Sequence, residues 1–207
     1  MNVVNYIPQD SRMRSSPALR WLSRLFLFLG VLAIGYAAYF YVSAYAFQKL
    51  ESHSFSDASP ATGPASSPAV PTGEVMGRIE IGRLGVSAVF VQGDSEQILR
   101  RAVGHVPQTA VPGSSGNVVL TGHRDTFFRA LRKIQEGDSI SLETTGGEYQ
   151  YAVESTAIVS PSATEVLQSS GRDELTLITC YPFYYIGAAP DRFVVHARRI
   201  GNPQEQF

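Results

Sequence analysis

The sequence predicts a mostly-β domain, closed or nearly closed into a barrel, that follows a single membrane-spanning helix. Three features lead to this prediction. Residues 25–47 form an apolar run without a charged residue, residues 48–74 are largely rich in Ser, Pro and Ala, and short β-type runs outnumber brief helical ones from Val75 onward. A chain with many short strands and few helices usually folds as a β-barrel or a sandwich, with the helices as small insertions.

The N-terminal residues are basic and precede a segment long enough to cross a bilayer. Residues 1–24 contain four arginines and one acidic residue, Asp10. At about 1.5 Å per residue, a helix over residues 25–47 would exceed the hydrocarbon core of about 30 Å. Arginines before a span favour a cytoplasmic N-terminus, so we expect one pass through the cytoplasmic membrane and an extracytoplasmic remainder. A cleaved signal peptide is the alternative, although its apolar region usually covers only about 7–15 residues.

We expect residues 48–74 to connect the membrane helix to the folded domain. From residue 52 onward this segment has frequent Ser, Pro and Ala and no apolar periodicity, which is typical of a flexible or semi-extended tether. The folded domain is expected at residues 75–201, and residues 202–207 form a short C-terminal tail.

Within the folded domain, runs that alternate or are continuously apolar predict strands. The predicted strands are residues 75–81, 86–91, 117–122, 139–143, 149–159, 175–179 and 192–197. Gly and Asp residues between several of these runs predict turns, so consecutive strands are expected to lie close together.

Three short helices are predicted between the strands. They are residues 94–102, 125–134 and 162–171. Asp94 and Ser162 each have a Gln or Glu three residues later, as in a capping box. Phe127 and Phe128 begin the apolar spacing of the second helix and are expected in the core, whereas His105 is placed in a loop after the first helix.

Three chemically versatile side chains fall at the ends of predicted strands: His123, Cys180 and Arg192. If strands 175–179 and 192–197 pair antiparallel, the end of one adjoins the start of the other. Cys180 and Arg192 then meet at one rim of the sheet, and side-chain alternation places Cys180 on the face opposite the residues at 175, 177 and 179.

The chemistry of these residue types suits acyl transfer. Cys180 is the single cysteine, so it forms no disulfide within the chain and no Cys-rich zinc site. A lone cysteine is often a small buried apolar residue, but a neighbouring cation can favour its nucleophilic thiolate. An imidazole such as that of His123 can give a proton to a leaving amine, and a guanidinium such as that of Arg192 can stabilise an oxyanion.

The sequences around these residues resemble the two signature blocks of the sortase family. LTGHRDTFFRAL surrounds His123, and TLITCYPFYYIGAAPDRFVVHA contains Cys180 with Arg192 twelve residues later. The second block, together with the preceding GHVPQTAVPGSSGN, resembles class D sortases in particular. The likeness covers about residues 77–200, essentially the whole predicted domain.

The resemblance implies an eight-stranded sortase-type β-barrel and the activity of a cysteine transpeptidase. Such an enzyme cleaves an LPxT-like sorting motif after its Thr through a thioacyl-enzyme, without a cofactor. It implies that Cys180 attacks, that His123 handles protons, and that Arg192 binds the substrate carbonyl or the oxyanion. The implied partners are secreted proteins with a C-terminal sorting signal and a primary-amine acceptor of peptidoglycan or a pilin.

Several neighbours are expected to bind substrate or to shape the site, with turn formation or packing as the alternative role. They are Gly122, Thr179, Tyr181, Pro182, Gly187 and Pro190. Asp125 either orients His123 or caps the following helix. His196 is an alternative base, because it shares a strand face with Arg192. The arginines expected to be solvated surface charges are Arg124, Arg198 and Arg199.

Charge and motifs argue against several other functions. The formal net charge is −1, so the global charge does not indicate nucleic-acid binding. No HExxH-type metal motif and no Gly-rich phosphate loop occurs in the sequence. Two alternatives stay open: another cell-wall cysteine enzyme, such as an L,D-transpeptidase or a papain-like amidase, and a non-catalytic binding module tethered to the membrane.

Overall fold

The computed structural model describes residues 17–56 and 70–201 of the chain. The chain divides into two compact units, with the boundary between Val42 and Ser43. Parts of three expected regions lie outside the described residues: 1–16 of the cytoplasmic segment, 57–69 of the tether, and the tail at 202–207.

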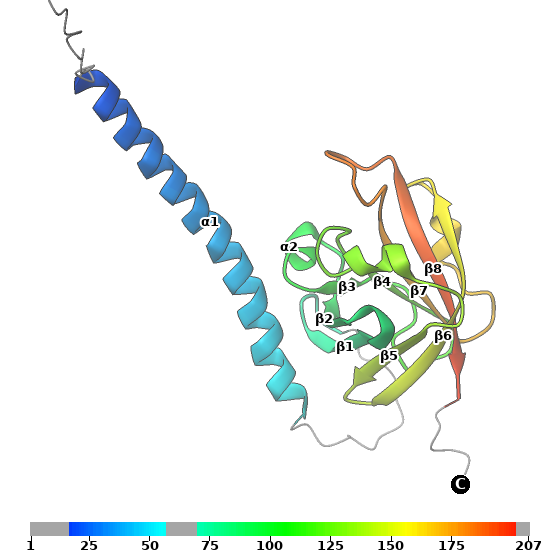
Figure 1. Cartoon of the computed structure of the whole chain (residues 1–207). Coiled ribbons are helices and arrows are strands. Elements are labelled where there is room, and N and C mark those ends of the chain that lie inside the picture. The colour runs from blue at the N-terminus through cyan, green and yellow to red at the C-terminus, as the bar shows by residue number, and fades with distance from the viewer. Residues whose placement is uncertain (1–16, 57–69, 202–207) are drawn as a thin grey trace, which may run out of the picture. The chain divides into compact units, whose positions relative to one another are not determined.

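Helix α1 (Pro17–Ser56) is a single helix of 40 residues (Figure 1). It begins at a proline, a residue that fits the first helical turn because no partner is needed there for its missing N–H. Its stretch Arg20–Tyr39 is long and apolar enough to cross a membrane, and the side chains of this stretch are exposed. The helix continues through residues 48–56, which we expected in the tether. No Pro or Gly follows Gly35 within α1, so no helix-breaking residue ends the helix earlier.

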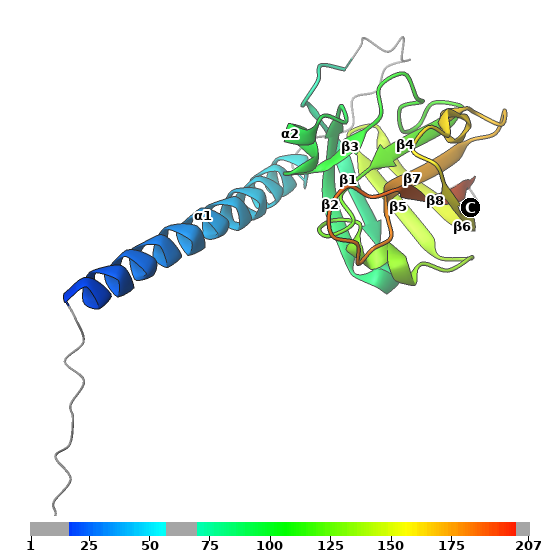
Figure 2. The same ribbon diagram turned by 90° about the horizontal axis from the view of Figure 1, so that it is seen from above.

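The barrel contains eight strands in the order β1-β2-β3-β4-β7-β8-β6-β5 and is closed by the pairing of β5 with β1 (Figure 1, Figure 2). The strands are β1 (Val75–Ile81), β2 (Val86–Gln92), β3 (Val103–His105), β4 (Asn117–Thr121), β5 (Ser139–Thr144), β6 (Gly147–Val159), β7 (Glu174–Tyr181) and β8 (Asp191–Ile200). Two neighbouring pairs, β2 with β3 and β4 with β7, are parallel. The expected closed β-barrel with short helices is therefore confirmed.

The helices of the barrel unit are shorter than predicted. They are η1 (Gly82–Leu84), α2 (Glu96–Leu99), η2 (Arg129–Lys133) and η3 (Thr164–Leu167). The residue before α2 is Ser95 and the residue before η3 is Ala163, and neither makes a side-chain cap bond, so the predicted capping boxes are wrong. The segment expected as a helix over 125–134 contains only a 3₁₀ helix, because apolar spacing of three and four residues suits either helix type.

The inward-facing residues of each strand make the barrel core. In β7, Leu175 and Leu177 are fully buried, whereas Cys180 has the opposite parity and is half-buried. Phe128, just before η2, is also fully buried, and Phe127 packs against the core, as expected for this pair. The predicted alternation along β7 therefore holds and places Cys180 on the outer face of the barrel wall.

Strand β3 was missed by the sequence pattern, and its presence changes the position of His105. The strand has three residues, too few for an alternation signal. His105 is 1% exposed, with its Nδ1 at 2.7 Å from Gln92 Oε1 and its Nε2 at 2.9 Å from the Ala110 carbonyl oxygen. Burial lowers the pKa of His105 below its ordinary value, and the bond to Ala110 opposes this only in part. The expected loop position is thus wrong, and His105 is a buried residue that ties β3 to the next loop.

Candidate active site

Strands β4, β7 and β8 are neighbours in the barrel and bring His123, Cys180 and Arg192 to one end of it. Cys180 is the direct pairing partner of Arg192 in the antiparallel β7–β8 register. On the other side of β7, the last parallel pair joins Thr121 to Ile178, and His123 and Cys180 each follow two residues later. Cys180 and Arg192 thus lie side by side on strands spaced about 4.8 Å apart, and His123 follows the end of the strand on the other side of Cys180.

Buried groups hold the chain just before His123 against β7. The Gly122 amide donates to the Ile178 carbonyl at 3.1 Å, and the Thr179 hydroxyl donates to the Gly122 carbonyl at 2.7 Å. A Cβ atom on Gly122 would lie 2.9 Å from the ring of Phe128, so a side chain there would displace this core residue. Both Gly122 and Thr179 are buried, which favours a role in positioning His123 over the predicted contact with substrate.

The thiol of Cys180 and the imidazole of His123 are both half-buried. Within residues 17–56 and 70–201, neither group makes a hydrogen bond or an ion pair. Asp125 does not provide the predicted support: it is exposed and, in the described part of the chain, makes no bond to His123. It is not a helix cap either, because Phe128 is the residue before η2. The nucleophile and base candidates therefore keep their hydrogen-bonding capacity for an incoming molecule.

Arg192 is half-buried and is oriented by the loop that precedes β8. Its Nη1 donates to the carbonyls of Ala189 at 3.3 Å and Asp191 at 3.0 Å. A guanidinium has five N–H donors in a planar fork, and among the described contacts these two bonds involve only Nη1. The remaining N–H groups are available to an oxygen atom that approaches Cys180.

Arg124, expected to be a solvated surface charge, instead binds the loop between β7 and β8. Its Nη1 donates to the Pro182 carbonyl at 3.1 Å, and its Nη2 donates to the carbonyls of Tyr185 at 2.8 Å and Gly187 at 3.0 Å. The guanidinium carbon also lies 5.9 Å from the centre of the Tyr185 ring. Because Arg124 directly follows His123, it links the histidine segment to the loop that connects Cys180 with Arg192. The surface assignment is wrong, since three backbone carbonyls surround this side chain.

Aromatic rings support the same loop from the barrel side. Tyr181, Phe183 and Phe193 have ring centres 5.3 to 6.3 Å apart. They border a hollow of about 470 Å³ whose lining also includes Pro182. Tyr181 and Pro182, predicted near the substrate, therefore line a hollow directly beyond Cys180, and Gly187 supplies a left-handed turn at φ 100°.

His196, the alternative base, lies on the predicted strand face but away from the thiol. It pairs with Thr176, and its Nδ1 is 3.5 Å from the Thr176 hydroxyl. Four residues of strand separate it from Arg192, which corresponds to about 13 Å. Because a general base must come within about 3 Å of the proton it removes, the geometry favours His123 over His196.

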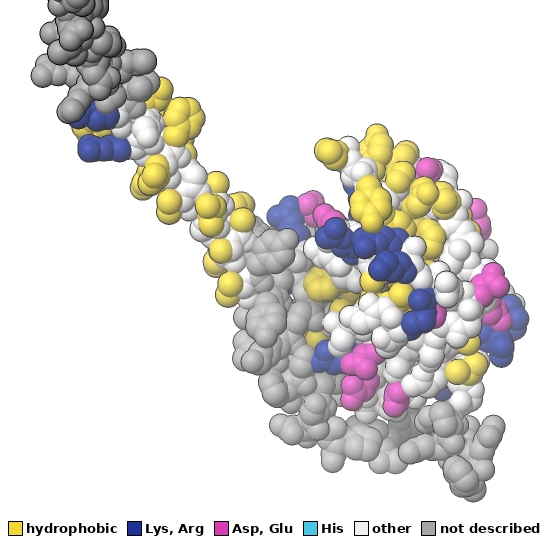
Figure 3. Space-filling model, viewed as in Figure 1, with side chains coloured by type: hydrophobic (Ala, Val, Ile, Leu, Met, Phe, Trp, Pro, Cys, Tyr) yellow, Lys and Arg dark blue, Asp and Glu magenta, His cyan; other side chains and the backbone are white. Residues whose placement is uncertain are grey.

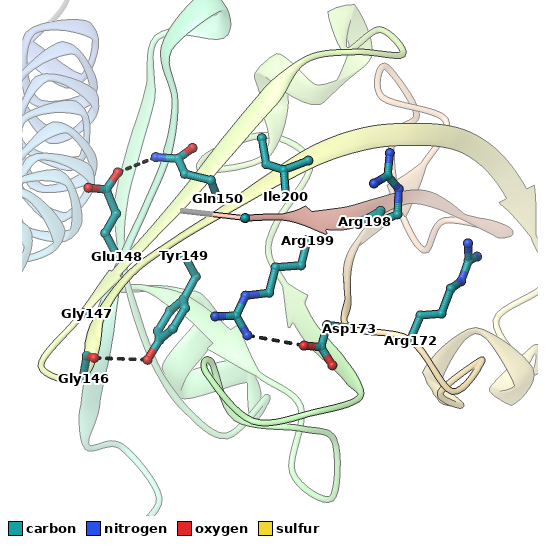
Figure 4. A pocket seen from close by; sticks show the side chains of 11 residues that line it. Gly146, Gly147, Glu148, Tyr149, Gln150, Arg172, Asp173, Arg198, Arg199 and Ile200 are labelled. Carbon is teal, nitrogen blue, oxygen red and sulfur yellow. Dashed lines mark hydrogen bonds and ion pairs between the residues drawn. The ribbon is translucent and has the colours of Figure 1, made fainter. Parts of the chain in front are cut away.

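A hollow of about 650 Å³ lies at the opposite end of the barrel, where β7 begins and β8 ends (Figure 4). Arg199 bonds Asp173 at 3.4 Å, and its guanidinium lies 4.9 Å from the centre of the Tyr149 ring. Arg198 is exposed, as expected of a surface charge, and pairs with Glu154 at 2.7 Å. The arginines that line this hollow are therefore each paired with a carboxylate.

A family model described as the sortase domain matches residues 79–200 of the chain. Sortase D of Bacillus subtilis is 35% identical over 130 residues, which cover 62% of this chain and 66% of that protein. Sortase A of Bacillus anthracis is 33% identical over 111 residues, which cover 52% of each chain. The matched segments thus span slightly less than two thirds of the first relative and about half of the second.

Solved structures that superpose on this chain are also described as sortases. A Sortase D5 transpeptidase of Clostridium perfringens superposes with a TM-score of 0.59 at 32% identity, over 64% of this chain and 82% of that one. Clostridium perfringens sortase C with the C-terminal cell wall sorting motif superposes with a TM-score of 0.60 at 29% identity, over 64% and 74%.

Proposed function

The chain belongs to the sortase family, and we propose from this that it is a membrane-anchored cysteine transpeptidase with Cys180 as its nucleophile. His123 is assigned as the acid and base, and Arg192 as the donor to the substrate carbonyl or the oxyanion. The observation that carries the assignment is that Cys180 pairs with Arg192 while His123 follows the end of the neighbouring strand β4, at the same end of the barrel. Each of them also lies at a strand end, where a rigid sheet fixes the backbone and leaves the side chain accessible.

In the proposed reaction, the Cys180 thiolate attacks the carbonyl carbon of the Thr in an LPxT-like motif. The carbonyl oxygen gains negative charge and accepts hydrogen bonds from Arg192. The C–N bond then breaks, and protonated His123 gives its proton to the leaving amine, which leaves a thioester on Cys180. A primary amine of the cell envelope or a pilin attacks this thioester, His123 takes the excess proton, and the thiolate leaves with a new amide bond formed.

We propose that the sorting motif lies along the outer face of β7 toward the hollow beyond Cys180. The thiol belongs to that face, and the part of the hollow that adjoins it in the strands is formed by Tyr181, Pro182 and Phe193, which are apolar side chains suited to a peptide segment. The solved sortase C with a sorting motif is a precedent in the family for binding of such a peptide.

We propose that α1 anchors the protein in the cytoplasmic membrane with its N-terminus inside. Support comes from the apolar stretch Arg20–Tyr39 and from the four arginines in residues 1–24, two of which precede this stretch and two of which lie in its first five residues. Alkaline phosphatase fused after Phe207 should be active in cells, because the enzyme matures outside the cytoplasm. Activity of a cytoplasmic reporter at the same position would contradict this orientation.

The transpeptidase assignment is tested with a quenched peptide library of LPxT-like sequences and the full chain in detergent. Wild type should cleave after Thr and, with an added amine, yield the amide product, whereas Cys180→Ala should give neither product nor thioester. Hydrolysis of peptidoglycan stem peptides instead would indicate another cell-wall cysteine enzyme. Peptide binding without turnover would indicate a binding module.

A further inference from the structure

The exposed apolar side chains of the barrel unit gather in one place. Among the described residues 70–201, the large apolar side chains that are exposed are Ile158 (54%), Tyr184 (76%), Tyr185 (48%) and Ile186 (98%). All four lie at the end of β6 or in the loop between β7 and β8, at the barrel end that holds Cys180. The space-filling view shows an apolar cap at this loop (Figure 3). Single exposed apolar residues are common, but a group at one rim indicates a contact surface.

Cationic side chains flank this apolar cap. Arg129, Arg132 and Lys133 of η2 are exposed, and the Arg132 guanidinium lies 5.5 Å from the centre of the Tyr184 ring. Figure 3 shows a band of Lys and Arg directly beside the apolar cap. Residues 122–134 contain four cationic residues and one acidic residue, although the whole chain has a formal net charge of −1. This end of the barrel thus combines exposed aliphatic and aromatic side chains with local positive charge.

This combination fits the boundary between lipid headgroups and acyl chains. Tyr and aliphatic side chains partition into that boundary, and Lys and Arg are attracted to anionic headgroups. We propose that the amphipathic rim, defined as Ile158, Tyr184, Tyr185, Ile186 and the cations of η2, docks on the anionic surface of the membrane that α1 enters. The proposal rests on the membrane anchoring proposed above.

The chain is long enough for this contact, although the connection to α1 enters the barrel at the other end. β1 begins at Val75, and Gly77 pairs with Thr144 beside the β5–β6 turn, far from the amphipathic rim. The barrel is about 30 Å high, as judged from a ten-residue strand at about 3.3 Å per residue. Pro71–Glu74 form a turn bonded to Gln92, but residues 57–70 can span up to about 50 Å at about 3.5 Å per residue, so either end can reach the bilayer. The chemistry of the rim, and not the attachment point, then decides which end faces the lipid.

An environment-sensitive dye on the rim tests the proposal in the full chain. In a Cys180→Ala background, Ile186→Cys provides the single thiol for labelling with the fluorophore NBD, and the protein is placed in lipid nanodiscs. We expect several-fold brighter, blue-shifted emission in nanodiscs with phosphatidylglycerol compared with phosphatidylcholine alone. Molar salt should reverse much of the difference, because it shortens the screening length to about 3 Å. The same label at Thr145→Cys, an exposed residue of the β5–β6 turn, should not respond.

Charge reversal separates lipid docking from other causes of a response. The double variant Arg129→Glu/Lys133→Glu should abolish the difference between the lipids, whereas Arg172→Glu at the opposite end should preserve it. An unchanged spectrum at residue 186, or a response at residue 145 instead, would overturn the proposal. A response that requires an added sorting peptide would show that the rim binds substrate and would overturn it as well. A separate Arg129→Glu/Lys133→Glu protein that retains Cys180 and Ile186 should cleave a soluble peptide in detergent, and this reports on the proposed transpeptidase independently.

Discussion

The two ends of the barrel use their polar side chains in opposite ways. At the end where β7 begins, Asp173 accepts from Ser115 at 2.7 Å and from Arg199 at 3.4 Å, and Arg198 is held by Glu154. At the other end, the thiol of Cys180 and the imidazole of His123 make no hydrogen bond and no ion pair among the described residues. The first end resembles a surface closed by its own ion pairs, and the second keeps reactive groups available.

This difference explains why the larger hollow is the weaker candidate for catalysis. The arginines that line the hollow of about 650 Å³ already pair with carboxylates. A ligand there would have to replace existing bonds, whereas a carbonyl group beside Cys180 would meet unused donors. The availability of chemical groups is therefore a better guide to function here than the size of the hollow.

The largest effect that tests the comparison is expected from His123→Ala. Removal of general acid–base catalysis typically costs about 10²–10⁴-fold in rate, so peptide turnover should fall by that factor. A thiol-reactive probe should still label Cys180 in this variant, which checks that the site is folded. His196→Ala is the matched control and should retain turnover. Equal loss in both variants would contradict the assignment of the base.

Arg192→Ala is expected to have the next largest effect. Loss of one oxyanion donor typically costs about 10²–10³ in rate. Arg192→Lys should also remain clearly impaired, because lysine keeps the charge but lacks the planar fork. Turnover is measured with the quenched peptide, and labelling of Cys180 should stay near normal. Wild-type turnover by Arg192→Ala would remove this residue from the mechanism and make Arg124 the next one to test.

Arg124→Ala should give a smaller loss, because Arg124 acts through the loop that it binds. Without its three carbonyl contacts the loop between β7 and β8 can shift, and a shift of about 1 Å can lower turnover by up to about 10²-fold. We expect roughly a 10-fold loss of kcat/KM with labelling of Cys180 retained. Arg129→Ala is the control, because Arg129 is exposed and, in the described residues, makes no bond to a carbonyl of this loop. A loss of the same size in Arg129→Ala would show that the carbonyl contacts are not the cause.

The strand pattern predicted the meeting of the candidate site residues better than it predicted the surrounding details. The meeting of Cys180 with Arg192 followed from alternation and antiparallel pairing alone, and the β7–β8 register confirms it. The place of His123 next to β7 needs the parallel pairing of β4 with β7, which joins segments more than fifty residues apart and leaves no local pattern. Arg124 donates to backbone carbonyls, and such bonds cannot be predicted from the residue types of the loop. Only its position directly after His123 indicated a place near the candidate site.

His105 offers a contrast to His123, because its ring bonds inside the protein at both nitrogens. Burial lowers the pKa of His105 in the folded chain below the ordinary value of 6.5. Between pH 6.5 and this lower folded-state pKa, the unfolded chain therefore binds more protons than the folded chain. The free energy of unfolding should therefore decrease as the pH falls through the folded-state pKa. Urea unfolding at several pH values should show this slope in wild type and a flatter one in His105→Gln. His196→Gln serves as the control, and a slope unchanged in His105→Gln would contradict the prediction.

The smallest effect is expected from Asp173→Asn at the end opposite Cys180. The hydrogen bond from Ser115 is the main cause that lowers the pKa of Asp173 below 3.8, with smaller contributions from the Gly116 amide and Arg199. A carboxylate with a lowered pKa stabilises the fold above pH 3.8, and this contribution disappears as the pH falls through the folded-state value. Asp173 is about a third exposed, so solvent screening limits the loss of unfolding free energy at neutral pH to about 1 kcal/mol or less. That loss should vanish in strong acid, where Asp173 itself is protonated, and should shrink in molar salt.

Peptide turnover should remain at the wild-type level in Asp173→Asn, since about seven residues of strand separate this end from Cys180. A turnover defect in Asp173→Asn without a stability defect would show that the two ends of the barrel are coupled, which contradicts the contrast between them.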